Sequence, residues 1–129
     1  FKKASVVTDL GYFDDYVVDN LRESDIMLVE ANHDINMLQV GPYPFYLKKR
    51  ILGQKGHLSN ESSGKLINSL LHDNLKKIYL GHLSKENNYD KLAYETVRLE
   101  IDMGDNSFKS SDFDIEVAKR DILSGICEI

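Results

Sequence analysis

Short β-type runs alternate with amphipathic segments along the chain, and this alternation constrains the fold more than any other feature. The runs predict strands and the segments between them predict helices, because apolar residues recur at helical spacing there. Strands are expected over 4–8, 25–30, 77–80 and 113–118, with 125–129 as a hairpin partner of the last, and helices over 14–23, 45–52, 60–72 and 89–103. The pattern favours an α/β domain with one largely parallel or mixed sheet flanked by helices.

Length and charge limit what such a domain does. The 129 residues suffice for one domain, and 21 Asp and Glu against 16 Lys and Arg give a net charge of −5. The whole surface therefore does not attract nucleic acid, so a phosphate substrate needs metal ions or a few well-placed lysines. With one cysteine, Cys127, and no apolar stretch near 18 residues, the chain is predicted to be soluble and cytoplasmic, without a membrane partner.

Polar residues that can carry chemistry follow three predicted strands. Asp9, Glu30 and His82 stand at strand ends, and His57 lies in a loop just before a predicted helix. Ligands of α/β sheets gather at the carboxyl ends of the strands, so a site is expected there. Each residue also has a simpler interpretation: Asp9 in a turn, Glu30 in a helix-capping cluster with residues 31–34, and His57 as an ordinary loop histidine. His82 is best explained as a metal ligand or an acid/base group.

The tetrapeptide Gly-His-Leu-Ser occurs twice, at residues 56–59 and 81–84. The flanking residues differ, which indicates parallel construction rather than a true repeat. Each glycine is expected to let the backbone turn tightly, so that the histidine points into a cleft. Each serine is expected to cap the next helix or to bond its own loop.

Four longer strings carry a family resemblance: "TDLGYFDDYV", "DIMLVEANHD", "GPYPFYLKKRILGQKGHLSNESSG" and "KKIYLGHLSKENN". Over about residues 4–100 the chain resembles metallo-β-lactamase-fold hydrolases of the YycJ (WalJ) branch, related to ribonuclease Z. The resemblance implies half of an αββα sandwich and a dinuclear metal site. Asp9 would bridge the two metals and His82 would be the last histidine ligand, while Glu30 and His57 would be catalytic and protonate the leaving group.

The same resemblance implies a function. The implied function is hydrolysis of phosphodiesters with two divalent ions, Zn²⁺ or Mn²⁺. The favoured form is a 5′-to-3′ exonuclease, and DNA is favoured over RNA as its substrate. Cyclic-nucleotide or other small phosphodiesters remain alternatives. Lys48, Lys49, Arg50 and Lys55 precede His57 and either line a groove for the nucleic-acid backbone or form a solvated helix face.

The chain also departs from the family pattern. It has no His-x-His-x-Asp-His cluster, and it begins with Phe1. Residues 1–129 are therefore expected to be the C-terminal half of the domain and to be inactive alone. One sheet face is expected to be open and to pair with the N-terminal half or a second copy; it would carry Val6, Met27, Val29, Ile78 and Leu80. A non-catalytic interaction module and a flavodoxin-like response regulator are the other candidate classes.

Overall fold

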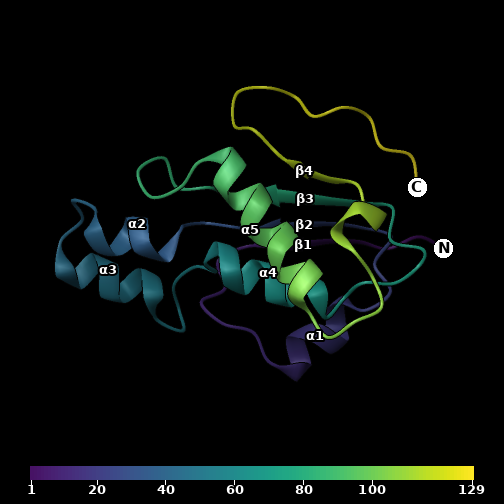
Figure 1. The fold of residues 1–129 in the computed structure, drawn as a ribbon, viewed down its shortest axis with the longest axis horizontal. Helices are drawn as coiled ribbons and strands as arrows, with labels where there is room; N and C mark the ends of the chain where they lie inside the picture. The colour runs from purple at the N-terminus through teal and green to yellow at the C-terminus, as the bar shows by residue number, and fades with distance from the viewer.

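A computed structural model describes residues 1–129 and contains four strands, five α-helices and one short 3₁₀ helix (Figure 1). The strands and helices predicted from periodicity are confirmed, although some of their ends differ. There are two exceptions: the predicted strand over 125–129 is absent, and helix α2 was not predicted. The elements in chain order are β1 Ala4–Val7, α1 Asp15–Leu21, β2 Ile26–Glu30, α2 Ile35–Val40, α3 Phe45–Leu52, α4 Asn60–Asn68, β3 Lys77–Gly81, α5 Asp90–Met103, η1 Ser110–Asp112 and β4 Ile115–Val117.

The sheet is parallel throughout, with the strands in the order β1-β2-β3-β4. Of the two sheet types that the alternation predicted, the largely parallel sheet is confirmed and the mixed sheet is not. Residues 125–129 form no strand, so β4 has no hairpin partner and ends the sheet at its edge. A flavodoxin-like domain has a point where the strand order reverses, and this order has none, so that alternative is also wrong.

The strand order explains why helices cover only one face of the sheet. Parallel strands are joined by right-handed crossovers, and when each new strand is added on the same side, every crossover passes over the same face. Helices α4 and α5 pack against each other on that face (Figure 1). The core lies between them and the sheet and includes Met27, Val29, Ile78, Leu80, Leu66, Ile67, Val97 and Ile101.

The sheet has an open face, as predicted, but most of the side chains that were predicted to lie on it are not there. Met27, Val29, Ile78 and Leu80 are all buried in the core beneath the helices. Successive side chains of a strand point to opposite faces, so the residues between them form the open face instead. Val6 is 72% exposed there, and Leu28 and Tyr79, paired in register beside it, are half-buried.

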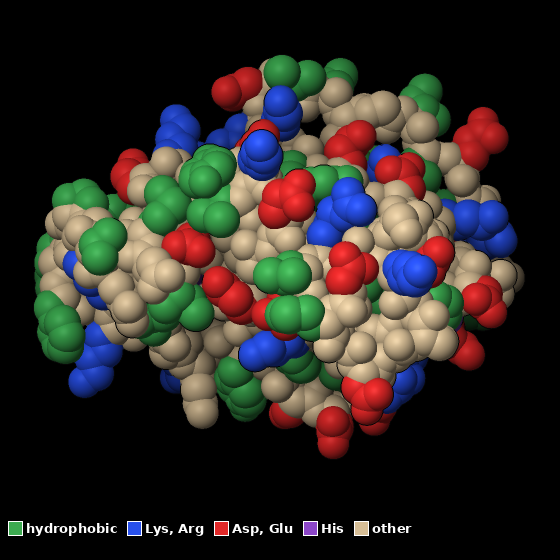
Figure 2. Space-filling model, viewed as in Figure 1, with side chains coloured by type: hydrophobic (Ala, Val, Ile, Leu, Met, Phe, Trp, Pro, Cys, Tyr) green, Lys and Arg blue, Asp and Glu red, His purple; other side chains and the backbone are tan.

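Helices α2 and α3 lie beyond the carboxyl ends of the strands, at the left of Figure 1. Helix α2 begins after Asp34, whose side chain accepts a hydrogen bond from the Met37 amide. Helix α3 ends at Gly53 as predicted, but it buries no residue completely, and Phe45 and Tyr46 are exposed. Hydrophobic side chains gather at this end of the molecule (Figure 2). None of the helices combines the length and apolar character needed to cross a membrane.

Candidate functional site

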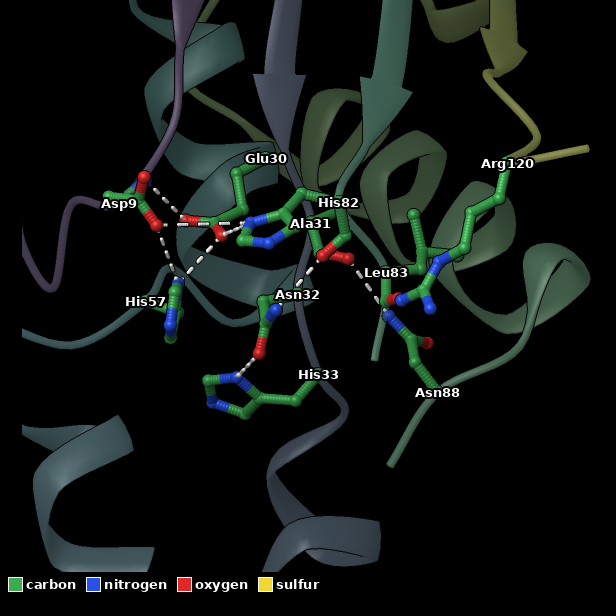
Figure 3. Close-up of polar contacts among 10 residues, drawn as sticks. All are labelled: Asp9, Glu30, Ala31, Asn32, His33, His57, His82, Leu83, Asn88 and Arg120. Atoms are coloured by element: carbon green, nitrogen blue, oxygen red, sulfur yellow. Dashed lines mark hydrogen bonds and ion pairs between the residues drawn. The ribbon is translucent and has the colours of Figure 1, made fainter. Parts of the chain in front are cut away.

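The structure brings Asp9, Glu30, His57 and His82 together at the carboxyl ends of the strands (Figure 3). Asp9 follows β1, Glu30 is the last residue of β2, and His82 follows β3. His57 comes from the loop between α3 and α4. One potential ligand atom from each side chain lies within 4.8 Å of those from the other three. We call this set the four-residue cluster.

Glu30 is the central member of the cluster. It is fully buried, its Oε2 accepts a hydrogen bond from the Asp9 amide at 3.0 Å, and its Oε1 lies 2.7 Å from Nδ1 of His57. The same Oε1 also contacts Nδ1 of His82. A buried carboxylate is costly unless it is paired and hydrogen-bonded, and these three partners satisfy it.

The contacts with Glu30 fix the roles of the ring nitrogens. An ionised carboxylate is only an acceptor, so Nδ1 of each histidine must carry the hydrogen that it donates. Both Nδ1 atoms also face the Asp9 carboxylate, whose Oδ1 lies 3.5 Å from Nδ1 of His57 and 4.0 Å from Nδ1 of His82. The two rings meet edge to face with centroids 5.3 Å apart. Their side chains are 28% and 47% exposed, respectively, and that of Asp9 is 69% exposed, so the cluster is open to solvent on one side.

Two members of the cluster have strained backbones. Asp9 has φ 61° and His82 has φ 55°, the left-handed region that side chains with a Cβ seldom adopt. Such strain persists only where surrounding contacts hold it and is concentrated at functional sites. Glu30 accepts the amide of Asp9, and Asn32 donates from Nδ2 to the carbonyl of His82 at 2.9 Å. Both strained residues are thus held by the end of β2 or the segment that follows it.

The segment after Glu30 lies between the two Gly-His-Leu-Ser tetrapeptides. The Asn32 amide donates to the Leu58 carbonyl at 3.0 Å, and the Ser84 amide donates to the Asn32 carbonyl at 2.7 Å. His33 pairs with Ser59 in an isolated parallel bridge. Within the segment predicted as a possible capping cluster, Asp34 is the cap, whereas Glu30 is a member of the four-residue cluster.

His33 is buried beside the cluster. Its Nδ1 lies 3.2 Å from Oδ1 of Asn32, and its Nε2 has no hydrogen-bond partner. Burial, with a smaller contribution from the neighbouring His57 and partial opposition from Asp34, lowers the pKa of His33 to about 4. The ring is therefore neutral at pH 7.

Neither glycine that precedes a cluster histidine works as predicted. No glycine in the chain has a positive φ, and the left-handed residue of the second tetrapeptide is His82 itself. The glycines provide space instead: a Cβ at Gly56 would lie 2.1 Å from the carbonyl oxygen of Ile51, and one at Gly81 would lie 3.2 Å from Cδ2 of Leu28. The expected roles of the serines are confirmed, because Ser59 caps α4 and Ser84 accepts the amide of Asn87.

A buried asparagine pair joins the two tetrapeptides, and the sequence pattern did not predict it. Asn60 and Asn88 exchange side-chain hydrogen bonds of 2.9 and 2.8 Å, and Asn88 also donates to the carbonyl of Ala31. The sequence favours Asn88 as the cap of α5, yet the residue at that position is Tyr89. A signal for the pair is present in the sequence, because each tetrapeptide is followed closely by an asparagine.

Four basic residues were predicted either to line a groove or to form a solvated helix face. Two of them line a cleft and the other two do not. Arg50 and Lys55 line a cleft of about 580 Å³ together with Asp9 and His57. Lys48 instead donates to the Gln39 carbonyl, and Lys49 is exposed outside the cleft. The remaining histidine, His72, lies away from the cluster and bonds the Ser24 carbonyl.

The donor set of the cluster fits a divalent metal ion. Two carboxylates and two imidazoles converge without a thiolate, and Zn²⁺ and Mn²⁺ both accept such ligands. The buried Glu30 behind the two imidazoles has the arrangement by which carboxylates orient metal-binding histidines.

Three curated proteins resemble the chain over 96 residues, or 74% of its length. "Exodeoxyribonuclease WalJ" of Streptococcus pneumoniae is 46% identical in strain D39 and in strain R6, and "Exodeoxyribonuclease YycJ" of Bacillus anthracis is 38% identical. The chain spans about a third of the length of these relatives, 36% in each case. No family model matches the chain. No solved structure matches it either.

The fold and the cluster thus define an α/β domain with a histidine and carboxylate site at the carboxyl ends of its strands. Over the aligned residues the chain belongs to the YycJ (WalJ) branch, as the four sequence strings predicted.

Proposed function

We propose that the chain contributes part of the active site of a metal-dependent exodeoxyribonuclease. The observation that carries the proposal is the convergence of Asp9, Glu30, His57 and His82 from four separate segments. The names of the curated relatives support DNA as the substrate. The 5′-to-3′ direction, the choice of Zn²⁺ or Mn²⁺ and the metallo-β-lactamase fold are part of the proposal.

In this proposal Asp9 and His82 hold metal. Bound divalent ions supply an activated water and neutralise charge on the phosphoryl oxygens. The exposed carboxylate of Asp9, which would hold metal, has an oxygen 3.5 Å from Nδ1 of His57. His82 would hold metal through its imidazole, whose Nδ1 contacts Glu30 and lies 4.0 Å from an oxygen of Asp9.

In this proposal His57 acts in its doubly protonated form: it gives the Nε2 proton to the departing oxygen and is left as a neutral ring that still donates from Nδ1 to Glu30. Its Nδ1 donates to the buried carboxylate of Glu30, so Nε2 is the ring nitrogen available for proton transfer. Glu30 fixes the orientation and tautomer of the ring, as an acid/base histidine requires. Because Glu30 contacts His82 as well, it couples the proton donor to the metal ligand.

We further propose that residues outside this chain complete the site and cover the open sheet face. Two metal ions of the kind proposed need more ligands than four side chains within 4.8 Å of one another provide. The exposed Val6 beside Leu28 and Tyr79 offers an apolar surface on which an N-terminal half would pack.

The test uses the intact protein that contains this chain. Purified protein is stripped with a chelator, reloaded with Zn²⁺ or Mn²⁺, and assayed on DNA labelled at one end. We expect metal-dependent release of nucleotides from the 5′ end, lost in Asp9→Asn and His82→Ala. Full activity in the stripped protein would overturn the proposal. Wild-type inactivity after reloading, with DNA binding unaffected by substitutions in the cluster, would favour a non-catalytic module.

A further inference from the structure

The cleft beside the four-residue cluster has the opposite charge balance to the whole chain. Its lining includes four basic residues, Arg50, Lys55, Lys85 and Arg120, and two acidic ones, Asp9 and Glu86. In the full chain the acidic residues outnumber the basic ones, 21 to 16. On the face covered by α4 and α5, basic and acidic side chains are interspersed (Figure 2). The cleft is therefore a local concentration of positive charge.

Three segments that are distant in sequence supply these four residues. Arg50 lies in the last turn of α3 and Lys55 in the loop after it. Lys85 directly follows the second Gly-His-Leu-Ser tetrapeptide, and Arg120 lies beyond β4. Tertiary packing brings them to one cleft that also contains Asp9 and His57.

The four positive charges are not neutralised within the chain. None of them has a carboxylate within 4.0 Å, whereas Lys119, next to Arg120, pairs with Asp90 at 3.8 Å. Arg120 donates to the carbonyl of Leu83, the residue after His82, which holds its guanidinium beside Leu83 (Figure 3). Glu86 accepts a hydrogen bond from the Tyr43 hydroxyl at 3.1 Å and not from a cation. Unpaired cations that converge in a cleft are available to an anionic ligand.

A second hollow of about 270 Å³ continues the path. It is bordered by His82 and shares Ser84, Lys85 and Arg120 with the first. Lys85 and Arg120 therefore lie between the two hollows. The first hollow contains Asp9 and His57, and the second contains His82. A chain of evenly spaced anions that entered the first hollow would pass the cluster and meet the same two cations on the way to the second.

We infer that Arg50, Lys55, Lys85 and Arg120 bind backbone phosphates of a single DNA strand and position the strand at the four-residue cluster. This inference rests on the proposed nuclease function and names the residues that select a polymeric substrate. Lysine and arginine neutralise phosphates, and arginine also forms paired hydrogen bonds with them. Tyr43 lines the same cleft, and an aromatic side chain among cations is typical of single-strand binding sites.

The geometry separates these four residues from the chemical step. They bind phosphates next to the bond that breaks, so their binding energy is available to a long strand and is absent for a minimal phosphodiester. The ratio of kcat/KM for an oligonucleotide to kcat/KM for bis(p-nitrophenyl) phosphate therefore measures their contribution.

The experiment compares Lys55→Ala, Lys85→Ala, Arg120→Ala and a combined variant with Arg50→Ala in the intact protein. The matched control is Lys49→Ala, since Lys49 is an exposed cation beside Arg50 that lies outside the cleft. We expect the kcat/KM ratio to fall at least about 10-fold in the combined variant, since removing a cation that neutralises a phosphate weakens strand binding. Affinity for a single-stranded oligonucleotide, measured with a chelator over roughly 50 to 200 mM salt, should show a slope smaller by about 0.7 per cation removed. Lys49→Ala should leave both the ratio and the slope at wild-type values.

The charge-keeping variants Arg50→Lys and Lys85→Arg distinguish weaker phosphate binding from a disrupted fold. They should retain most of the salt slope, and all variants should unfold at the wild-type temperature. Equal effects of the cleft variants and Lys49→Ala would overturn this inference and leave the nuclease proposal standing. A wild-type protein that neither binds nor cuts DNA would overturn both.

Discussion

The two Gly-His-Leu-Ser tetrapeptides resemble each other within their four residues and differ in their surroundings. In each, the histidine contacts Glu30, the leucine packs on the core, and the serine accepts an amide three residues later. The first lies in a loop before α4, whereas the second begins at the end of β3. The tetrapeptide thus fixes its own hydrogen bonds, and the surrounding structure decides how each imidazole is presented.

The difference in presentation separates the proposed roles. His82 has a left-handed backbone and a side chain that is 47% exposed, whereas His57 has an ordinary backbone and a side chain that is 28% exposed. A strained, more open residue at a strand end is suited to binding metal that other residues also hold. A more enclosed ring is suited to proton transfer beside that metal. Substitutions in the intact protein test this division of roles.

His82→Ala should have the largest effect in the intact protein. It removes a proposed metal ligand, so metal content and nuclease rate should fall together to the level of the chelated enzyme. Metal analysis on the same sample as the rate measurement checks this. Normal metal content with an abolished rate would move His82 from metal binding to proton transfer.

His57→Ala should lower the rate about 10²–10⁴-fold, the range for loss of a general acid. Metal content should stay near normal, because in the proposal His57 is not a ligand. The loss should be smaller with a nitrophenolate leaving group, which departs without a proton. An emptied metal site would show that His57 is a metal ligand like His82, and equal losses on both substrates would rule out proton donation by His57.

Glu30→Gln should affect both tetrapeptides, because Glu30 contacts both histidines and the Asp9 amide. We expect metal affinity to fall about 10- to 100-fold, the usual cost of losing a carboxylate behind a metal-binding histidine. Excess metal should restore occupancy without restoring the full rate, because His57 would remain misoriented. Complete recovery of rate with metal would limit Glu30 to support of His82.

Substitution of the glycine in each tetrapeptide should change the free energy of unfolding by different amounts. Gly56→Ala places a methyl group 2.1 Å from a backbone oxygen, so it should lower the free energy of unfolding by about 1–3 kcal/mol. Gly81→Ala meets only the end of the Leu28 side chain at 3.2 Å, which can move, and should cost well under about 1 kcal/mol. Denaturant unfolding of both variants measures the difference; equal losses would show that the second segment is as tightly packed as the first.

The free energy of unfolding should depend on pH through His33, which pairs with Ser59 of the first tetrapeptide. Its pKa is about 4 in the folded protein against an ordinary value of 6.5, so the unfolded chain binds the proton more readily. The stabilisation by neutral His33 is complete above pH 6.5 and is lost as the pH falls through about 4. Unfolding measured across this window should depend less on pH in His33→Gln. The same slope in wild type and variant would assign the dependence to other groups.

The sequence determined the elements and the cluster members because both depend on local patterns. Apolar runs ending in Asp9, Glu30 and His82 predicted strands whose carboxyl ends carry polar side chains, and parallel pairing brings such ends to one edge. Helix α2 was missed because its six residues lie between the Glu30 segment and the prolines at 42 and 44, too short for a clear period.

Tertiary structure alone decided which face of the sheet is open, how Asn60 pairs with Asn88, and where the cations gather. The parallel order of the strands sends every crossover over one face, and this reversed the predicted assignment of Met27 and Ile78. Lys85 and Arg120 are 35 residues apart in the chain and line one cleft with Arg50. Periodicity describes only neighbours along the chain, whereas a charged cleft depends on which distant segments the packed core holds side by side.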